Sequence, residues 1–472
     1  MIALRHAELF QFPLRLRMPF RYGIATLTQL PHTLVRLTFE IDGAVQTGVA
    51  GDNLPPKWFT KDAARAADDE ISEMLDVIRS AVQVARDARA ATPAAFWREV
   101  SAAQGAAARA RGWPALLANF GVSIVERALA DAFCRRNNTT FAAAARDNRF
   151  GLDLGALHPS LAGSAPRDWL PAQPPAAVFA RHTVGLADAL EDADVPAADR
   201  VEDGLPQSLV ACIRAYGLRH FKLKINGEAE RDRGRVEAMA RILARECPAG
   251  YAFTLDGNES FREVGAFADY FRGLTALPGL REFWPHLLFV EQPWHRDVAL
   301  SPAIGDLAQT WPDRPPIIID ESDAETDSLA QALRLGYAGT SHKNCKGIFK
   351  SIANACLLAQ RRQAGAPAAF SGEDLTNVGI VALTQDLAAA AALGITSVER
   401  NGHHYFAGLS QFPGALQQHA LERHPDLFAA GPAGWPRTIL RDGRVALGSI
   451  NAAPFGVPGD LDLSELRAEI IA

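Results

Sequence analysis

The chain has 472 residues, of which 48% are hydrophobic and 22% charged, and its formal net charge is −6 at pH 7. This composition is typical of a soluble globular protein, and the length suggests two or three domains. A net negative charge disfavours nucleic acid and an anionic membrane as partners. No apolar run approaches the length of a membrane span, and we expect no signal peptide. The five scattered cysteines favour a reduced, cytoplasmic protein over a disulfide framework.

The first 55 residues have the alternation of hydrophobic and polar residues that predicts β-structure. The pair Asp42-Gly43 lies between two such runs and predicts a hairpin turn. Segments 18–23 and 51–56, which together contain aromatic residues, Pro and Gly, break the pattern. Such segments are either lids over a site or simple connectors, and the sequence by itself favours connectors.

From residue 61 to about residue 136 the pattern changes to that of amphipathic helices. One set of hydrophobic residues recurs at helical spacing and marks a single buried face: Ile71, Met74, Leu75, Ile78 and Val82. A second strong helix is predicted over residues 122–135. Residues 155–180 are rich in Pro, Ala and Ser, and we expect them to form a linker.

After residue 175, short apolar runs alternate with amphipathic stretches at a regular spacing. Eight β-then-α units of this kind predict an α/β fold with a parallel barrel. The predicted strands are residues 180–185, 220–225, 252–256, 287–291, 316–320, 339–343, 368–373 and 395–399. In such a barrel the reactive side chains gather where the strands end, at the C-terminal rim.

Two lysines stand at alternate positions of the second predicted strand, so Lys222 and Lys224 should point to the same face. Lysine is rare in this chain, with seven residues among the 48 that are Lys or Arg. Arginine cannot lose its proton in a protein, whereas lysine can. Two ammonium groups on one face of an apolar strand repel each other and resist burial, which lowers a lysine pKa. We therefore interpret the pair as a candidate catalytic base.

Three consecutive predicted strands end abruptly at a carboxylate, namely Asp256, Glu291 and Asp320. Each interval has about the length of one βα unit, so the three groups should stand side by side on the rim. A single carboxylate at a strand end most often caps a helix or meets an arginine, but three in succession favour a shared cation. A hard divalent cation with oxygen ligands, above all Mg²⁺, would neutralise them.

The sixth predicted strand ends at Lys343, so lysines on strands two and six flank the three carboxylates. A substrate held over the metal would then have an amine on each face. This arrangement suits removal of a proton next to a carboxylate, with the metal stabilising the enediolate and one lysine taking the proton. The other lysine could return a proton on the opposite face, giving racemisation or epimerisation. Alternatively, it could stabilise charge during elimination or ring opening.

Together, the Lys-x-Lys strand, the Asp/Glu/Asp trio and the lysine of strand six resemble the enolase superfamily, in particular its mandelate racemase/muconate lactonizing enzyme subgroup. Residues 123–131 are similar to the last helix of the family's capping domain, and residues 443–463 to the segment that returns to it. The resemblance implies a modified TIM barrel, (β/α)₇β, with an N-terminal α+β capping domain that the C-terminal segment completes. We expect the cap over residues 1–175, the barrel over 176–415 and the returning segment over 416–472.

The resemblance also implies a role for most of the candidate residues. It makes Lys224 the base, Lys222 its tuning partner and a contact for the substrate carboxylate, and Lys343 the opposite base. The implied ligands of Mg²⁺, or of Mn²⁺ in its place, are Asp256, Glu291 and Asp320. The implied substrate-binding residues are Asn258, beside the metal, and Phe20, Tyr22 and Asn53 of the two cap segments. Glu373 and His404 are further candidates for substrate binding that the resemblance does not supply. We expect a small-molecule carboxylate as the substrate and a homo-oligomer as the assembly.

The chain departs from the family pattern after strand six. The family commonly has two glycines there, whereas this chain has one, preceded by Lys346. We favour Lys343 over Lys346 as the lysine that faces the pocket. Strands seven and eight do not indicate a substrate. Glu373 could support the lysine of strand six, and His403 and His404 could either contact the substrate or form a surface turn.

Two other functions stay open at this point. An acid-sugar dehydratase of the same superfamily would use a histidine with an aspartate of strand six on the second face, which Lys343 disfavours. A barrel that keeps the metal site but serves only binding is the non-enzymatic alternative. The complete set of lysines and carboxylates argues against it, because a site without selection for catalysis would be expected to lose a lysine first.

Overall fold

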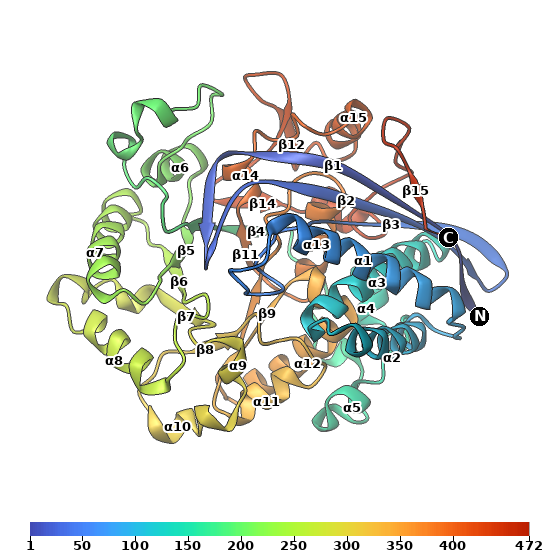
Figure 1. Cartoon of the computed structure of the whole chain (residues 1–472), viewed down its shortest axis with the longest axis horizontal. Helices are drawn as coiled ribbons and strands as arrows, with labels where there is room; N and C mark the ends of the chain where they lie inside the picture. Colours follow the sequence, from blue (N-terminus) through green and yellow to red (C-terminus); the bar gives the residue numbers. More distant parts are fainter. Residues whose placement is uncertain (472) are drawn as a thin grey trace.

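The computed structural model describes residues 1–471, which form a capping domain and a closed barrel (Figure 1). The cap contains a four-stranded antiparallel sheet in the order β15-β1-β2-β3. Its strands are β1 (Ile2–Tyr22), β2 (Ala25–Ile41), β3 (Ala44–Asn53) and β15 (Glu469–Ile470). The β-structure and the hairpin turn predicted for the first 55 residues are confirmed. The connectors predicted at 18–23 and 51–56 are largely wrong, because pairing with β2 extends β1 and β3 into both segments.

Three long helices form a layer against this sheet (Figure 1). They are α1 (Ala67–Asp87), α2 (Pro93–Arg111) and α3 (Ala115–Arg136), so the predicted helical region is confirmed. Helix α3 approaches β3 very closely, because a Cβ atom on Gly48 would lie 2.0 Å from the carbonyl oxygen of Ala128. Gly48 therefore sets how deeply α3 packs onto the sheet.

Short helices connect the cap to the barrel in and before the region where the sequence predicts a linker. They are α4 (Phe141–Arg146) and α5 (Leu154–Leu157), followed by short turns up to the first barrel strand. Buried His158 fixes this connection to the barrel, since its Nε2 atom lies 2.9 Å from Oδ1 of Asn354.

Eight parallel strands form the barrel, in chain order from β4 to β11, and pairing of β11 with β4 closes it. The eight predicted strands are thus confirmed, with ends that shift by a few residues. The strands are β4 (Ala177–Val184), β5 (His220–Lys224), β6 (Ala252–Asp256), β7 (Leu287–Glu291), β8 (Ile317–Ile319), β9 (Gly339–His342), β10 (Ala369–Gly372) and β11 (Ser397–Arg400).

Helices follow the barrel strands and surround them (Figure 1). The modified TIM barrel that the resemblance implies is therefore present. The helices are α6 (Leu209–Tyr216), α7 (Ala229–Glu246), α8 (Val264–Thr275), α9 (Arg296–Ala299), α10 (Leu307–Thr310), α11 (Ser328–Arg334), α12 (Ile348–Gln363), α13 (Ala382–Ala392) and α14 (Gly402–Tyr405).

The register of the barrel brings together side chains that are far apart in the sequence. On β5, Leu223 is fully buried in the core beneath the helices, so Lys222 and Lys224 occupy the opposite face. Lys224 pairs with Asp256 across β5 and β6, and Asp256 pairs with Glu291 across β6 and β7. These strand-end residues therefore meet at the C-terminal rim, as the sequence predicts.

The C-terminal segment runs back across both parts of the molecule. Its elements are α15 (Gly414–Arg423), β12 (Phe428–Ala430), β13 (Pro436–Thr438), β14 (Arg444–Ala446), α16 (Gly448–Ala452) and β15. Strand β14 pairs antiparallel with β4, whereas Phe455 stacks on Phe141 of the cap side with ring centroids 4.3 Å apart. The segment returns to the cap after adding a strand to the barrel sheet. The division into domains after residues 175 and 415 stays a proposal.

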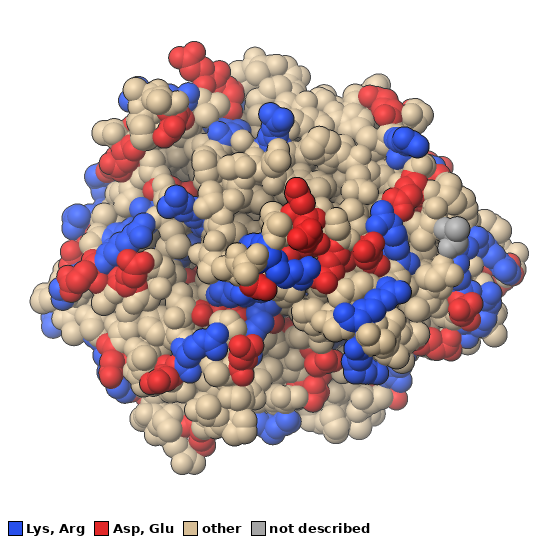
Figure 2. Space-filling view, viewed as in Figure 1, with Lys and Arg blue, Asp and Glu red and all other residues tan. Residues whose placement is uncertain are grey.

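The mixed charges at the surface and the unpaired cysteines match what the composition predicts. On the face in Figure 2, acidic and basic side chains are interspersed. Within residues 1–471, no helix combines the length and the apolar character that crossing a membrane requires. The five cysteines are all buried and free.

Candidate active site

A cavity lies at the C-terminal rim of the barrel, where residues of the cap cover it. Its empty volume is about 420 Å³. Eight of the predicted site residues line it: Lys222, Lys224, Lys343, Asp256, Asp320, Asn258, Phe20 and Tyr22. Pro55 and Trp58 line it as well, so both irregular cap segments, 18–23 and 51–56, reach the cavity.

The ammonium group of Lys222 is surrounded by carboxylates. Its Nζ atom lies 2.8 Å from Oε1 of Glu291 and 3.0 Å from one oxygen each of Asp256, Glu373 and Glu399. Burial favours the neutral amine, but these four charges outweigh it and hold the pKa of Lys222 well above its ordinary value. The lowered pKa predicted for this lysine is therefore wrong, because the strand pattern does not reveal how many carboxylates reach it.

Lys224 has fewer charged neighbours. Its Nζ atom lies 2.5 Å from Oδ2 of Asp256, and its side chain is buried but reaches the cavity. The same Asp256 oxygen lies 3.0 Å from Nζ of Lys222. Lys224 therefore needs to break only its contact with Asp256 before its amine can act on a molecule in the cavity.

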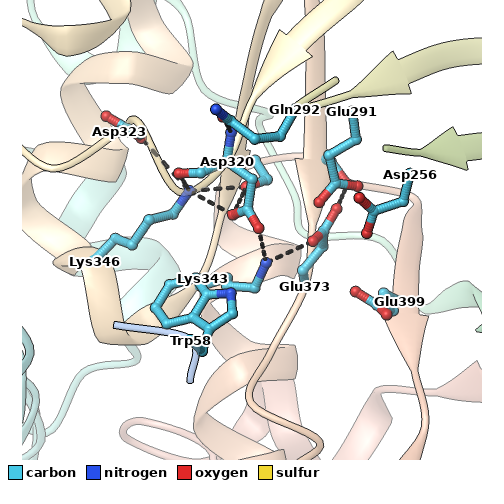
Figure 3. A network of polar contacts seen from close by, with 12 residues as sticks. Trp58, Asp256, Glu291, Gln292, Asp320, Asp323, Lys343, Lys346, Glu373 and Glu399 are labelled. Atoms are coloured by element: carbon cyan, nitrogen blue, oxygen red, sulfur yellow. Dashed lines mark hydrogen bonds and ion pairs between the residues drawn. The ribbon is translucent and has the colours of Figure 1, made fainter. Parts of the chain in front are cut away.

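Lys343 reaches the same cavity from the end of β9 (Figure 3). Its Nζ atom lies 2.6 Å from Oδ2 of Asp320 and 2.7 Å from Oε2 of Glu373. The ring of Trp58 covers it, with 5.2 Å between Nζ and the ring centroid, a distance at which the cation and the ring attract each other. Burial favours the neutral amine, but Asp320 and Glu373 outweigh it and raise the pKa of Lys343 well above its ordinary value.

Lys346 approaches Asp320 from the other side (Figure 3). Its Nζ atom lies 3.1 Å from Oδ1 of Asp320 and 2.8 Å from Oγ of Ser341. Lys346 lines a different groove, next to α2 and α3. Lys343 is thus the lysine that faces the pocket, as the sequence favoured, and Lys346 holds Asp320 in position.

The carboxylates form a group that could hold a divalent cation. Glu291, Asp320 and Glu373 each offer one oxygen, and these atoms lie within 4.8 Å of one another; Asp256 stands beside them (Figure 3). Oε2 of Glu291 is buried and has no hydrogen-bond partner within residues 1–471. Burial, with the charges of Asp256 and Glu373, raises the pKa of Glu291 well above its ordinary value. A donor set made only of oxygens, with one unsatisfied carboxylate oxygen, fits Mg²⁺.

Glu373 links the two sides of the site. Besides its contacts with Lys222 and Lys343, it lies 3.2 Å from Nη2 of Arg181. Burial opposes ionisation, but these three cations outweigh it and hold the pKa of Glu373 well below its ordinary value. Its side chain is fully buried and lies between the lysines, which agrees with support of the strand-six lysine and not with a substrate contact.

Two other residues predicted as substrate contacts lie outside the cavity. Asn53 is buried at the cap, where its Nδ2 donates to the carbonyl of Thr376 and its Oδ1 lies 2.7 Å from Nδ1 of His32. His404 is buried against α6, with Nδ1 3.4 Å from Sγ of Cys212, and burial lowers its pKa to about 3. Both assignments to substrate binding are therefore corrected. The prediction that His403 and His404 form a surface turn is also wrong, because packing determines the direction of the side chains that follow the end of a strand.

Residues around this site that sequence reasoning missed include Arg181, Glu399, Trp58 and Gln292. Glu399 lies near the end of the last barrel strand, next to Lys222. The search for carboxylates at strand ends, which identified Asp256, Glu291 and Asp320, would also have identified it. Gln292 follows Glu291 and accepts the backbone N–H of Asp320 at 2.7 Å. No local pattern marks Arg181, Trp58 or Gln292, because their partners come from other parts of the chain.

No protein-family model and no curated protein matches the sequence. The structure is nevertheless similar to solved structures over almost the whole chain. A muconate lactonizing enzyme from Pseudomonas fluorescens, complexed with muconolactone, is 17% identical with a TM-score of 0.60, and the match covers 98% of this chain and 99% of that one. A dipeptide epimerase from Enterococcus faecalis V583, complexed with Mg and L-Leu-L-Tyr, is 15% identical with a TM-score of 0.60, covering 97% and 100%.

An enolase superfamily member from Listeria innocua Clip11262 is 16% identical with a TM-score of 0.61, covering 100% of this chain and 99% of that one. At such identities the similarity establishes the fold and leaves the activity open. The capping domain, the closed barrel and the returning C-terminal segment are all included in these matches. The chain therefore has the fold of the enolase superfamily.

Proposed function

We propose that this protein is a Mg²⁺-dependent enzyme that removes the proton from the carbon next to the carboxylate of a small organic acid. One observation supports this most strongly: Lys224 and Lys343 come from β5 and β9 and line one cavity. The strands between them carry Asp256, Glu291 and Asp320 at their ends. The proposal includes membership of the muconate lactonizing enzyme subgroup of the superfamily; a homo-oligomeric state and a cytoplasmic location stay predictions.

Asp256, Glu291 and Asp320 would hold the cation, and Glu373 lies close enough to orient them. When bound, Mg²⁺ would supply positive charge at the place where negative charge grows on the substrate carboxylate. A lysine ammonium group also lies against each of the three carboxylates. The rim thus carries both the anionic ligands and the amines that this chemistry needs.

Lys224 would act as the base. It takes the proton from the α-carbon onto Nζ, and the electron pair of the broken C–H bond moves into the substrate carboxylate. Lys222 would stay protonated beside it, since four carboxylates surround its ammonium group. A protonated Lys222 can donate hydrogen bonds to the substrate carboxylate.

Lys343 would return a proton to the opposite face of the α-carbon. Racemisation or epimerisation of the acid then requires no further group. Cycloisomerisation and elimination use the same first step, with Lys343 protonated to stabilise charge. Phe20, Tyr22 and Trp58 form an aromatic wall that excludes water from the amines and suits an apolar part of the substrate.

The dehydratase alternative has less support. It would require a histidine at the second face, and the histidine beside Lys343 is His342. Nδ1 of His342 lies 2.8 Å from Oγ of Ser351, in the direction of α12, and the side chain is buried away from the cavity. Lys343 is therefore the better candidate for the group on that face.

The test is hydrogen exchange in D₂O with a panel of chiral α-substituted acids in the presence of Mg²⁺. We expect the wild type to exchange the α-proton of at least one acid, and Lys224→Ala to lose that exchange by several orders of magnitude. Lys343→Ala should still exchange but no longer invert the centre. Arg233→Ala, which removes an exposed cation of α7 outside the cavity, serves as the control and should behave as wild type. No exchange across the panel, with Mg²⁺ binding demonstrated by calorimetry, would favour the non-enzymatic alternative.

A further inference from the structure

Three side chains that commonly bind metals meet outside the barrel lumen. His182 of β4, Cys212 of α6 and His404 of α14 each offer one ligand atom, and these atoms lie within 4.8 Å of one another. All three residues are at most 2% exposed. We propose that this His182–Cys212–His404 cluster is a second metal site, selective for Zn²⁺. The proposal is independent of the function proposed for the carboxylate cavity.

The cluster is separated from the cavity by the wall of the barrel. On β4, Arg181 contacts Glu373 and Thr183 donates to Glu399, so both neighbours of His182 point into the barrel. Because side chains alternate along a strand, His182 points outward to the surrounding helices. Strands of a parallel barrel are covered on both faces and are mostly hydrophobic, so an outward-facing histidine beside a cysteine and a second histidine is unusual.

The chemistry of the three ligands selects the metal. A thiolate and two imidazoles favour Zn²⁺, whereas Mg²⁺ prefers oxygen ligands. Zn–S and Zn–N bonds of about 2.3 and 2.0 Å at a tetrahedral angle place sulfur and nitrogen about 3.5 Å apart. Sγ of Cys212 lies 3.4 Å from Nδ1 of His404. This pair already has the separation that a bound Zn²⁺ requires, and the ligand atom of His182 lies within 4.8 Å of both atoms.

Groups around the cluster match those found behind zinc ligands. Nδ1 of His182 lies 3.1 Å from Nε2 of His403, so a neighbouring side chain fixes the orientation of the His182 ring. A ligating histidine is usually oriented by a hydrogen bond through its second ring nitrogen. Asp188 accepts the hydroxyl of Tyr405 at 2.7 Å and brings a negative charge near the cluster. His404 and Asp188 also line a surface groove, which provides a route for the ion and for a water molecule as fourth ligand.

The position of the cluster suggests what the ion would stabilise. Strand β4 pairs with β11 where the barrel closes, and α14 follows β11 directly (Figure 1). From the cap, Nη1 of Arg17 donates to the carbonyl of His404 at 2.7 Å. An ion bound to His182, Cys212 and His404 would therefore tie the first barrel strand to the segment after the last one and to the cap strand that contacts it.

The test uses the full chain, stripped of metal with a chelator and titrated with Zn²⁺, or with Co²⁺ as a spectroscopic probe. We expect one equivalent of Co²⁺ to give the charge-transfer absorption of a cobalt–thiolate bond, and Zn²⁺ to abolish it. Cys212→Ala and His404→Gln should remove the absorption and weaken Zn²⁺ binding at least tenfold. His403→Ala, which removes only the supporting hydrogen bond, should weaken binding about 10- to 100-fold.

Two control variants distinguish this site from the other buried thiols and from the carboxylate cavity. Cys356→Ala removes a buried thiol of α12 and should keep the full absorption. Glu291→Gln weakens the carboxylate site in the barrel and should also keep it. The proposal is overturned if the wild type shows no thiolate absorption with Co²⁺, or if Cys212→Ala binds Zn²⁺ as the wild type does. The wild-type spectrum decides by itself if the ligand variants fail to fold.

Discussion

Nζ of Lys343 lies 2.7 Å from Oε2 of Glu373, and both side chains are buried. The same oxygen lies 3.0 Å from Nζ of Lys222, so one carboxylate joins the two sides of the cavity. Arg181 holds the other oxygen of Glu373 in place. Two buried ammonium groups can therefore stand close together without substrate, because a shared negative charge lies between them.

This contact predicts that Glu373→Gln is strongly destabilising. The substitution leaves Lys222, Lys343 and Arg181 with one negative charge fewer in a buried region. Breaking a buried ion pair by removing one partner costs about 3–5 kcal/mol, and we expect a loss of that size in the free energy of unfolding from urea titrations. Glu40→Gln, which removes the partner of Arg5 at the surface, is the control and should cost less than about 1 kcal/mol. Equal losses in the two variants would contradict the role given to Glu373.

The carboxylate group predicts stabilisation by Mg²⁺. An ion that binds only the folded chain raises its stability by about 2.7 kcal/mol when the concentration is 100-fold above Kd. We expect the melting temperature of the chelator-treated protein to rise on addition of Mg²⁺, and Glu291→Gln to lose most of this rise. Glu282→Gln changes an exposed glutamate and should respond as the wild type. A wild-type protein that shows no response to Mg²⁺ would count against the proposed site.

Glu126 predicts a pH dependence of stability that is independent of the active site. It is buried in α3, where it accepts the backbone N–H of Ile348, and burial raises its pKa from 4.5 to about 8. The folded state holds the carboxyl proton of Glu126 more tightly than the unfolded state does. The resulting contribution to the free energy of unfolding is therefore fully present below pH 4.5 and is lost as the pH rises through about 8.

Glu126→Gln keeps the neutral form at every pH. We expect the variant to resemble the wild type at pH 5 and to be the more stable of the two at pH 9, in free energies of unfolding measured by chemical denaturation. The two proteins should therefore differ increasingly between these values. A wild type that is the more stable protein at pH 9 would contradict the burial argument.

Gly48 predicts a steric limit at the contact of sheet and helix. A Cβ atom there would lie 2.0 Å from the carbonyl oxygen of Ala128, and backbone cannot yield as a flexible side chain does. We expect Gly48→Ala to lower the melting temperature markedly through overpacking, which typically costs about 1–3 kcal/mol. Gly234→Ala is the matched control, because this position lies within α7 with open space around it. Alanine should stabilise that helix by roughly 0.5–1 kcal/mol.

Much of the site followed from the sequence because it depends on local patterns. The spacing of apolar runs predicts eight strands, and parallel strands of a barrel end at one rim. Asp256, Glu291 and Asp320 each stand at such an end, and Lys222 and Lys224 share a face because side chains alternate. These positions need no knowledge of distant contacts, and the structure has them where the sequence predicts them.

The tertiary structure alone decided the contacts that these side chains make. Lys222 meets four carboxylates from four different strands, which reversed the direction expected for its pKa. Asn53 and His404 turn away from the cavity, because neighbouring elements supply better partners there. Sequence by itself thus determined which strand each charge stands on. Packing between distant segments determined which charges touch, and these contacts set the pKa of each group and the chemistry that it can perform.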